Sequence, residues 1–254
     1  MIDLHSHVLP GVDDGAVSLE ESVEMARTAA ADGTRWLAAT PHVRQDYPTE
    51  AATMERLVDE VQAAVDAAGV AIRVLPGGEL AIDALDALDD RALRRFGLGG
   101  NPRYLLVEFP YVGWPLGLDE RLFSLRTKGF VPVVAHPERN RDVQDDPERL
   151  DTLVRAGCLV QVTAASLDGR LGRSSAACGR RLVELGLAHL LASDAHHPSV
   201  REVGLRRAAR AIGDVELARW LTVGVPRAIV EDRPVPPRPE TGHRRGMLGR
   251  LLGD

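Results

Sequence analysis

Residues 1–15 read MIDLHSHVLPGVDDG, and this stretch decides how the rest of the chain is interpreted. Residues 2–5 predict a short strand that begins almost at the N-terminus. Side chains two apart on a strand point to the same face, so His5 and His7 would converge. Two neighbouring imidazoles make half of a metal site, although an H-x-H pair also occurs by chance at polar strand ends. Further metal-binding residues elsewhere in the chain would favour a metal site over a chance pair.

Apolar runs elsewhere in the chain end repeatedly in residues that can bind metal. These residues are His42, Glu79, Glu108, His136, Asp194 and His196. The runs predict strands over 34–40, 70–75, 104–109, 131–135, 158–163 and 188–193. The segments between and after them predict helices over 18–33, 48–68, 82–95, 118–128, 147–156, 174–185, 200–212 and 215–223.

This alternation repeats about seven times and predicts an α/β fold, a single-domain parallel β/α barrel. In such barrels the functional side chains lie at the carboxyl ends of the strands, where the strand-to-helix loops meet on one face. The acidic and histidine residues would therefore point at a common centre. Independent surface positions would not recur so consistently at strand ends.

The composition is that of an ordinary soluble protein. The chain has 254 residues, of which 44% are hydrophobic and 27% charged. A net charge of -6 argues against a duplex nucleic acid as partner. No stretch reaches the roughly 20 apolar residues of a transmembrane helix, and the N-terminus lacks signal-peptide features, so we expect a cytoplasmic protein.

The two cysteines, Cys158 and Cys178, fit a reducing compartment and offer no disulfide framework. Cysteine-dependent phosphatases place an arginine six positions after the nucleophile. Ala164 and Glu184 occupy those positions here. We therefore expect both cysteines to be buried small hydrophobic residues.

The composition changes near residue 232. Pro234, Pro236, Pro237 and Pro239 precede a short basic and apolar end. We expect a barrel domain over residues 1–231 and a proline-rich, basic, flexible tail over residues 232–254.

The candidate ligands suit divalent Mn, Fe, Zn or Co, because these ions accept imidazole and carboxylate together. The nine donors are His5, His7, Asp14, His42, Glu79, Glu108, His136, Asp194 and His196. Nine donors are too many for one ion. Two or three clustered ions would activate a water and neutralise phosphoryl oxygens, so phosphoester hydrolysis is the expected reaction class.

Ordered motifs along the chain carry a resemblance to a known family. They are Ile2-Asp3-Leu4-His5-Ser6-His7, Val12-Asp13-Asp14-Gly15, Pro41-His42, Gly78-Glu79, His136-Pro137-Glu138-Arg139 and Ser193-Asp194-Ala195-His196. Over about residues 1–230 the chain resembles the PHP (polymerase and histidinol phosphatase) superfamily. Within it, the chain is similar to the bacterial CpsB/CapC-type protein-tyrosine phosphatases, which regulate capsule and exopolysaccharide synthesis.

The resemblance implies a distorted (β/α)7 barrel with a trinuclear centre, with manganese as the expected metal. It assigns one ion to His5, His7, Glu79 and Asp194, a second to Glu79, Glu108 and His136, and a third to Asp14, His42 and His196. It also implies that Arg139 and Arg201 grip the phosphate, a task that suits a guanidinium fork.

The resemblance further implies a phosphotyrosine protein as substrate and a bacterial tyrosine kinase as partner. We expect a metal-bridging hydroxide to attack phosphorus in line, without a covalent phosphoenzyme. Tyr111 and Trp114 could stack on the substrate ring. Asp3 could orient a histidine or simply lie on the polar face of its strand, and Asp13 could cap the turn. A homo-oligomeric state is a further alternative that the sequence does not decide.

Other readings keep the same residues but change the function. Another PHP phosphatase would act on histidinol phosphate or a small nucleotide with nearly the same metal site. A polymerase-associated exonuclease would need an attached polymerase domain and fits the acidic charge poorly. A non-catalytic metal-binding scaffold would use the proline-rich tail to bind partners, yet all nine donor positions are intact.

Overall fold

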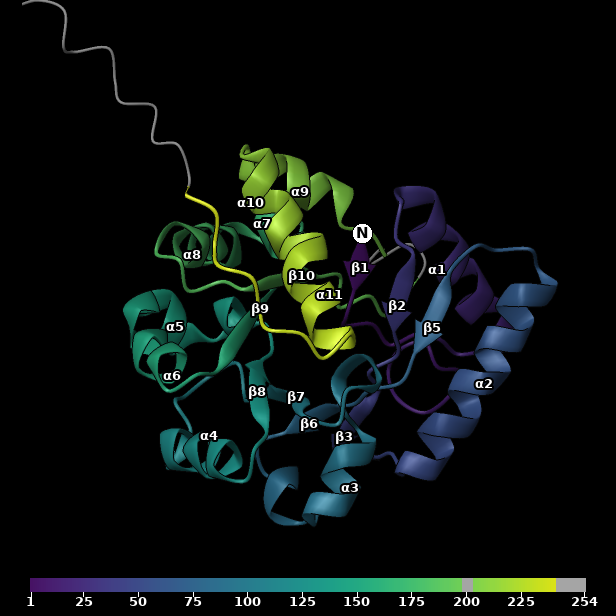
Figure 1. Ribbon diagram of the computed structural model, residues 1–254, viewed down its shortest axis with the longest axis horizontal. Helices are drawn as coiled ribbons and strands as arrows, with labels where there is room; N and C mark the ends of the chain where they lie inside the picture. Colours follow the sequence, from purple (N-terminus) through teal and green to yellow (C-terminus); the bar gives the residue numbers. More distant parts are fainter. Residues whose placement is uncertain (198–202, 241–254) are drawn as a thin grey trace, which may run out of the picture.

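The computed structural model describes residues 1–197 and 203–240. Short parallel strands form the centre of the molecule, and helices surround them (Figure 1). The strands are β1 (Ile2–Asp3), β2 (Trp36–Ala38), β3 (His42–Arg44), β4 (Tyr47–Pro48), β5 (Arg73–Leu75), β6 (Glu79–Ala81), β7 (Tyr104–Glu108), β8 (Val131–Val134), β9 (Leu159–Thr163) and β10 (Leu190–Ala192).

The α-helices follow the strands in alternation. They are α1 (Leu19–Asp32), α2 (Ala51–Ala67), α3 (Asp90–Arg95), α4 (Leu118–Thr127), α5 (Arg141–Asp145), α6 (Asp151–Arg155), α7 (Ala164–Leu167), α8 (Arg173–Glu184), α9 (Arg206–Ile212), α10 (Val215–Arg219) and α11 (Val225–Val230). Shorter helical segments are η1 (Ala84–Asp86), η2 (Leu98–Gly100), η3 (Pro137–Arg139), η4 (Pro147–Leu150) and the π-helical η5 (Trp220–Gly224). In the described ranges, no helix is long and apolar enough to cross a membrane.

Hydrogen bonding arranges the strands into a curled seven-position barrel. One sheet has the order β1-β2-β5, and the other has the order β10-β9-β8-β7-β6-β3-β4. A parallel bridge between Ser6 and Ala195 joins the first strand segment to the last. All the barrel pairs are parallel, and β4 adds an antiparallel hairpin partner to β3. The predicted α/β barrel is confirmed.

Local sequence explains where the first two helices begin and end. The Ser18 hydroxyl caps α1 by accepting a hydrogen bond from the Glu21 amide at 3.3 Å. Gly33 ends α1 with φ 98°, a left-handed conformation that glycine adopts without a Cβ clash. In α2, which lies within the predicted helix over residues 48–68, the buried side chains recur at helical spacing. They are Ala51, Met54, Leu57, Val58, Val61 and Val65.

Two of the barrel positions differ from the prediction because their strands are interrupted. Residues 34–40 were expected to form one strand, but β2 ends at Ala38 and a second strand, β3, begins at His42. The third position breaks in the same way, so Glu79 begins β6 instead of following β5 directly. After each break the donor begins a new strand: His42 begins β3 and Glu79 begins β6. The two residues are register partners, so they lie side by side.

The predicted helix over residues 82–95 is also wrong in its first half. Only η1 and the short α3 form there, because Asp89 caps α3 through the Ala92 amide and starts a new helix. At the C-terminal end the helix expected over 215–223 continues to Val230. The continuation runs through the π-helical η5 into α11. Pro226 lies in the first turn of α11, where the lack of a backbone N–H costs little stability.

The described part of the tail, residues 232–240, packs against the barrel without forming a helix or strand. The Trp220 indole donates a hydrogen bond to the Pro236 carbonyl at 2.9 Å, and Arg238 donates one to the Val183 carbonyl at 2.8 Å. These contacts place residues 232–240 against the barrel, and the boundary at residue 231 and the flexibility of the tail stay predictions. Residues 241–254 lie outside the described residues.

Candidate metal centre

All nine predicted donors lie in one contiguous cluster at the carboxyl ends of the barrel strands. Four groups of donor atoms have members within 4.8 Å of one another, and they share His5, His7, His42 and Glu79. Of the nine side chains, only Asp14 belongs to an exposed residue. We call these nine residues the donor cluster.

Four of these donors lie close enough together to contact one metal ion. The Nε2 atoms of His5 and His7 are 3.3 Å apart. Each of these nitrogens lies 3.3 Å from Glu79 Oε2 and 3.4 Å from Asp194 Oδ1. Ligands at about 2.0–2.1 Å around a tetrahedral ion are about 3.3–3.4 Å apart. The set therefore has the size and chemistry to hold a divalent ion.

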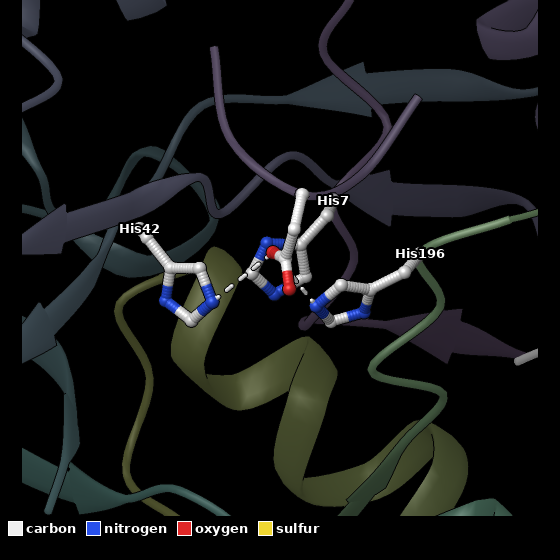
Figure 2. A group of neighbouring side chains, drawn as sticks. His7, His42 and His196 are labelled. Atoms are coloured by element: carbon white, nitrogen blue, oxygen red, sulfur yellow. Dashed lines mark ion pairs between the residues drawn. The ribbon is translucent and has the colours of Figure 1, made fainter. Parts of the chain in front are cut away.

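A second set lies on the more open side of the cluster. Asp14 Oδ1 is 3.4 Å from His42 Nε2 and 3.3 Å from His196 Nε2. In Figure 2, His42 and His196 approach from opposite sides, with His7 between them. These contacts agree with the set that the resemblance assigned to a third ion, and the structure adds His7 to the same group.

Glu79 lies at the junction of the remaining donors. Its Oε1 is 2.7 Å from His136 Nε2, and its Oε2 is 3.0 Å from His42 Nδ1. Glu108 Oε1 is 3.1 Å from the same His42 nitrogen. The structure thus groups His136 with His5 and Glu79, and Glu108 with His42 and Glu79, whereas the resemblance placed Glu79, Glu108 and His136 together.

Two buried atoms of the cluster lack a well-formed hydrogen bond among the described residues. They are His42 Nδ1 and Glu79 Oε2, both enclosed by the other donors. A buried carboxylate oxygen without a donor is costly unless a charge compensates it. A cation among these atoms would supply that compensation, so the donor set fits a metal.

The orienting partners of two histidines were not predicted. The His7 Nδ1 lies 2.7 Å from Asp13 Oδ2, and the His5 Nδ1 lies 2.9 Å from Gln161 Oε1. When Nδ1 donates its proton to these oxygens, Nε2 is left with a lone pair directed at the centre. Gln161 is a lone polar residue in the otherwise apolar segment 158–162, which was the available signal.

Asp13, rather than Asp3, orients a histidine of the donor cluster. The Asp3 carboxylate accepts hydrogen bonds from the Ser193 and His5 amides, at 2.9 and 3.4 Å, and within residues 1–197 and 203–240 it is hydrogen-bonded to no imidazole. It connects the backbones of β1 and the last strand, and burial raises its pKa to about 6. Asp13 does cap the turn through the Gly15 amide, but it also orients His7.

Gly15 explains why the Asp13 loop can return to the strand end. A Cβ at Gly15 would lie 2.1 Å from the His7 carbonyl oxygen, so any side chain would clash. The Ala16 amide then donates a hydrogen bond to that carbonyl at 3.0 Å. This contact places Asp13 beside His7 and Asp14 beside His42.

Two donors have backbone conformations that are uncommon for residues other than glycine. His136 has φ 32° and Asp194 has φ 51°. Such conformations persist where the surrounding structure holds them, and they concentrate at functional sites. Both residues occur two positions after the end of a strand, β8 and β10, and their side chains belong to the donor cluster.

Electrostatics couples the imidazoles to the carboxylates. Burial alone would lower the pKa of His42, but the Glu108 and Glu79 carboxylates raise it to about 9. Burial would raise the pKa of Asp13, but the hydrogen bond to His7 lowers it to about 2. Burial likewise opposes ionisation of Glu79, yet the surrounding histidines hold its pKa well below the usual value. The carboxylates of Asp13, Glu79 and Asp194, whose pKa values are all lowered, therefore stay anionic and attract cations.

One of the two predicted phosphate-binding arginines lies beside the cluster. Arg139 Nη1 is 2.5 Å from Asp194 Oδ2, and its guanidinium lies 4.5 Å from the centroid of the Tyr111 ring. The Tyr111 ring is also 5.8 Å from the His136 ring. Arg201 lies outside the described residues, so its role stays a prediction.

The two aromatic residues of the 110–117 loop have different surroundings. Tyr111 is beside the donor cluster, whereas Trp114 packs edge-on against Phe109 and beneath Arg149. Trp114 is thus engaged in packing, and the stacking of Tyr111 on a substrate ring stays a prediction. Its hydroxyl pKa is raised to about 12 by burial.

The cysteines are not placed for catalysis. Cys158 and Cys178 are both buried, and burial raises their pKa values to about 11 and about 12. A thiol needs a lowered pKa to act as a nucleophile near neutral pH. The prediction that both are buried hydrophobic residues is confirmed.

This combination of a β/α barrel and a buried donor cluster is typical of metal-dependent hydrolases. The family model "Capsular polysaccharide synthesis, CpsB/CapC" matches residues 1–216. The chain therefore belongs to the CpsB/CapC family, as the motifs indicated.

Individual relatives support this assignment. Tyrosine-protein phosphatase YwqE of Bacillus subtilis is 39% identical over 202 residues, which is 79% of each protein. Tyrosine-protein phosphatase CpsB of Streptococcus pneumoniae is 27% identical over 245 residues, covering 92% of this chain and 99% of CpsB.

Solved structures give the same result. A structure from the study "Crystal structures of YwqE from Bacillus subtilis and CpsB from Streptococcus pneumoniae, unique metal-dependent tyrosine phosphatases" superposes with a TM-score of 0.84. It has 32% identity and covers 95% of this chain and 100% of that chain. A β-aspartyl dipeptidase from Fervidobacterium islandicum, 13% identical with a TM-score of 0.53 over 90% of this chain and 74% of its own, shares only the fold.

Proposed function

We propose that this protein is a metal-dependent protein-tyrosine phosphatase of the CpsB/CapC family. The observation that carries the proposal is the close approach of donor atoms from His5, His7, Glu79 and Asp194 in a chain that belongs to the CpsB/CapC family. We further propose that all nine donors of the cluster hold two to three divalent ions, manganese being the first candidate. Iron, zinc and cobalt are the alternatives.

The chain's own residues would bind and orient the substrate. Arg139 is proposed to grip the phosphate oxygens, and its hydrogen bond to Asp194 beside the donor cluster supports this role. Arg201 is proposed as a second phosphate ligand. Tyr111, Phe109 and Pro110 line a cleft of about 280 Å³ that would take the tyrosyl ring.

Divalent ions held by the donor cluster would activate water and neutralise the phosphoryl oxygens during an in-line displacement. The leaving tyrosyl oxygen has a phenol-like pKa near 10, so it needs less protonation than an alkyl oxygen would. The two buried cysteines stay protonated at neutral pH because burial raises their pKa values, so they supply no nucleophile. Attack by water without a phosphoenzyme is therefore the proposed route.

We also propose the biological setting. The substrate would be a phosphotyrosine protein, and a bacterial tyrosine kinase that controls capsule or exopolysaccharide synthesis is the proposed partner. The relatives named CpsB and CapC connect the family to capsule synthesis. A cytoplasmic location and a homo-oligomeric state are parts of the same proposal.

The test is phosphate release by the purified protein with added manganese or with chelator. A phosphotyrosine peptide, a phosphoserine peptide and histidinol phosphate are compared in parallel. We expect release from phosphotyrosine alone, lost with chelator and in His136→Ala. Preference for histidinol phosphate would keep the metal site but move the function to another PHP branch, and no release from any substrate would refute catalysis.

A further inference from the structure

We propose that a groove beside the candidate metal centre binds the polypeptide that flanks the phosphotyrosine. The groove lies between the β3–β4 hairpin, the start of α2, and the η1–α3 segment, and we call it the flanking groove. This inference rests on the proposed phosphatase function. It adds a second binding region, which a small phosphomonoester would not need.

The flanking groove continues the cleft that would hold the tyrosyl ring. Arg44, Ala81 and Asp83 line both hollows. The cleft reaches the donor cluster through Glu108, whose Oε1 is 3.1 Å from His42. A chain whose phosphotyrosine enters the cleft can therefore run directly into the groove.

The two hollows differ in volume, which indicates that each would hold a different part of the substrate. The cleft of about 280 Å³ is at the lower end of small-molecule sites, and the flanking groove of about 910 Å³ is near the upper end. A phosphotyrosine side chain needs only the cleft. The larger hollow has room for several neighbouring residues of the same polypeptide.

The lining of the groove suits an extended polypeptide. Short side chains allow a backbone to approach closely, and apolar side chains of the substrate could pack against the half-buried Leu88. The alanines that line the groove are Ala51, Ala52, Ala81, Ala84, Ala87 and Ala92.

The charges along the groove are largely compensated. Arg44 Nε is 2.8 Å from Asp46 Oδ1, and Arg95 Nη2 is 2.6 Å from Glu55 Oε2. Such pairing leaves little net field to attract a polyanion. The groove therefore fits flanking residues that are small or apolar and carry little charge.

The test fills the groove and compares two substrates. Ala52→Trp and Ala87→Trp each add an indole at an exposed groove position, where the larger side chain displaces no core residue. The substrates are a phosphotyrosine peptide of about ten residues and p-nitrophenyl phosphate. The control is Ala211→Trp, an exposed alanine of α9 that does not line the groove.

Each groove variant is expected to raise KM for the peptide about tenfold, equivalent to about 1.4 kcal/mol. Both constants for p-nitrophenyl phosphate should stay within about twofold of wild type, as should every constant of the control. Shortening the peptide should raise KM in wild type and have less effect in Ala87→Trp.

Unchanged peptide kinetics in both folded groove variants would overturn the proposal. An equal loss on both substrates would also overturn it, because the indoles would then act on the donor cluster. If wild type hydrolyses p-nitrophenyl phosphate but no phosphotyrosine peptide, the proposed function itself fails, and that result is distinct from a failure of the groove alone.

Discussion

The Asp13 carboxylate is predicted to fix His7 for metal binding, and Asp13→Asn tests this role with little change in shape. Asp13 Oδ2 contacts His7 Nδ1 at 2.7 Å and accepts from the His42 amide at 3.0 Å, while Oδ1 accepts from the Gly15 amide at 2.9 Å. An asparagine amide has one oxygen and one donor nitrogen. Whichever way it is turned, a backbone N–H loses its acceptor.

Two magnitudes follow from this geometry. Replacing a partner that orients a metal ligand costs about 10–100-fold in metal affinity or activity, or about 1.4–2.7 kcal/mol. A buried amide left without an acceptor costs about 1–3 kcal/mol of folding free energy. The variant should therefore bind manganese more weakly and unfold more easily in its metal-free form.

Isothermal titration with manganese measures the affinity, and urea denaturation with chelator measures the stability. The control is Asp59→Asn, which makes the same chemical change at an exposed position of α2. Phosphate release by Asp13→Asn should recover at high manganese concentration. Wild-type affinity together with wild-type stability in Asp13→Asn would refute the assigned role.

Three further predictions concern stability. Because the pKa of His42 in the folded, metal-free protein is about 9, above the ordinary value, its stabilising charge is complete below about pH 6.5 and is lost as pH rises through 9. Urea titrations between pH 6 and 10 should show a falling free energy of unfolding, with a weaker fall in His42→Asn; equal slopes would contradict this. Glu138→Ala should lower the free energy of unfolding by about 1–3 kcal/mol, since the Thr163 amide loses its buried acceptor at 3.0 Å; a neutral effect in urea would count against it. Trp220→Phe removes the indole donor to Pro236 and should cost about 0.5–1.5 kcal/mol by the same assay. Limited proteolysis should cut the tail faster in this variant, and an unchanged cleavage rate would contradict the role of the indole in docking the tail.

The sequence predicted the barrel and the donor cluster for a physical reason. Strand-helix alternation fixes the fold class, and parallel strands bring their carboxyl ends to one face. Donors at those ends, such as His136 and Asp194, must then meet. His5 and His7 converge because side chains two apart on a strand share a face.

Other features depended on contacts between segments that are distant in sequence. The interruptions before His42 and Glu79 follow the pairing of β3 with β6, in which these two residues are register partners. Gln161 is 156 positions from His5, so periodicity could not pair them. The flanking groove likewise arises only when the β3–β4 hairpin packs beside α3.

The most direct test of the central claim is anomalous diffraction from crystals of the manganese-loaded protein. We predict one peak enclosed by His5, His7, Glu79 and Asp194, and a second beside Asp14, His42 and His196. Glu79→Gln should abolish or weaken the first peak. Manganese found only at exposed acidic side chains, with the donor cluster free of anomalous density, would contradict the account.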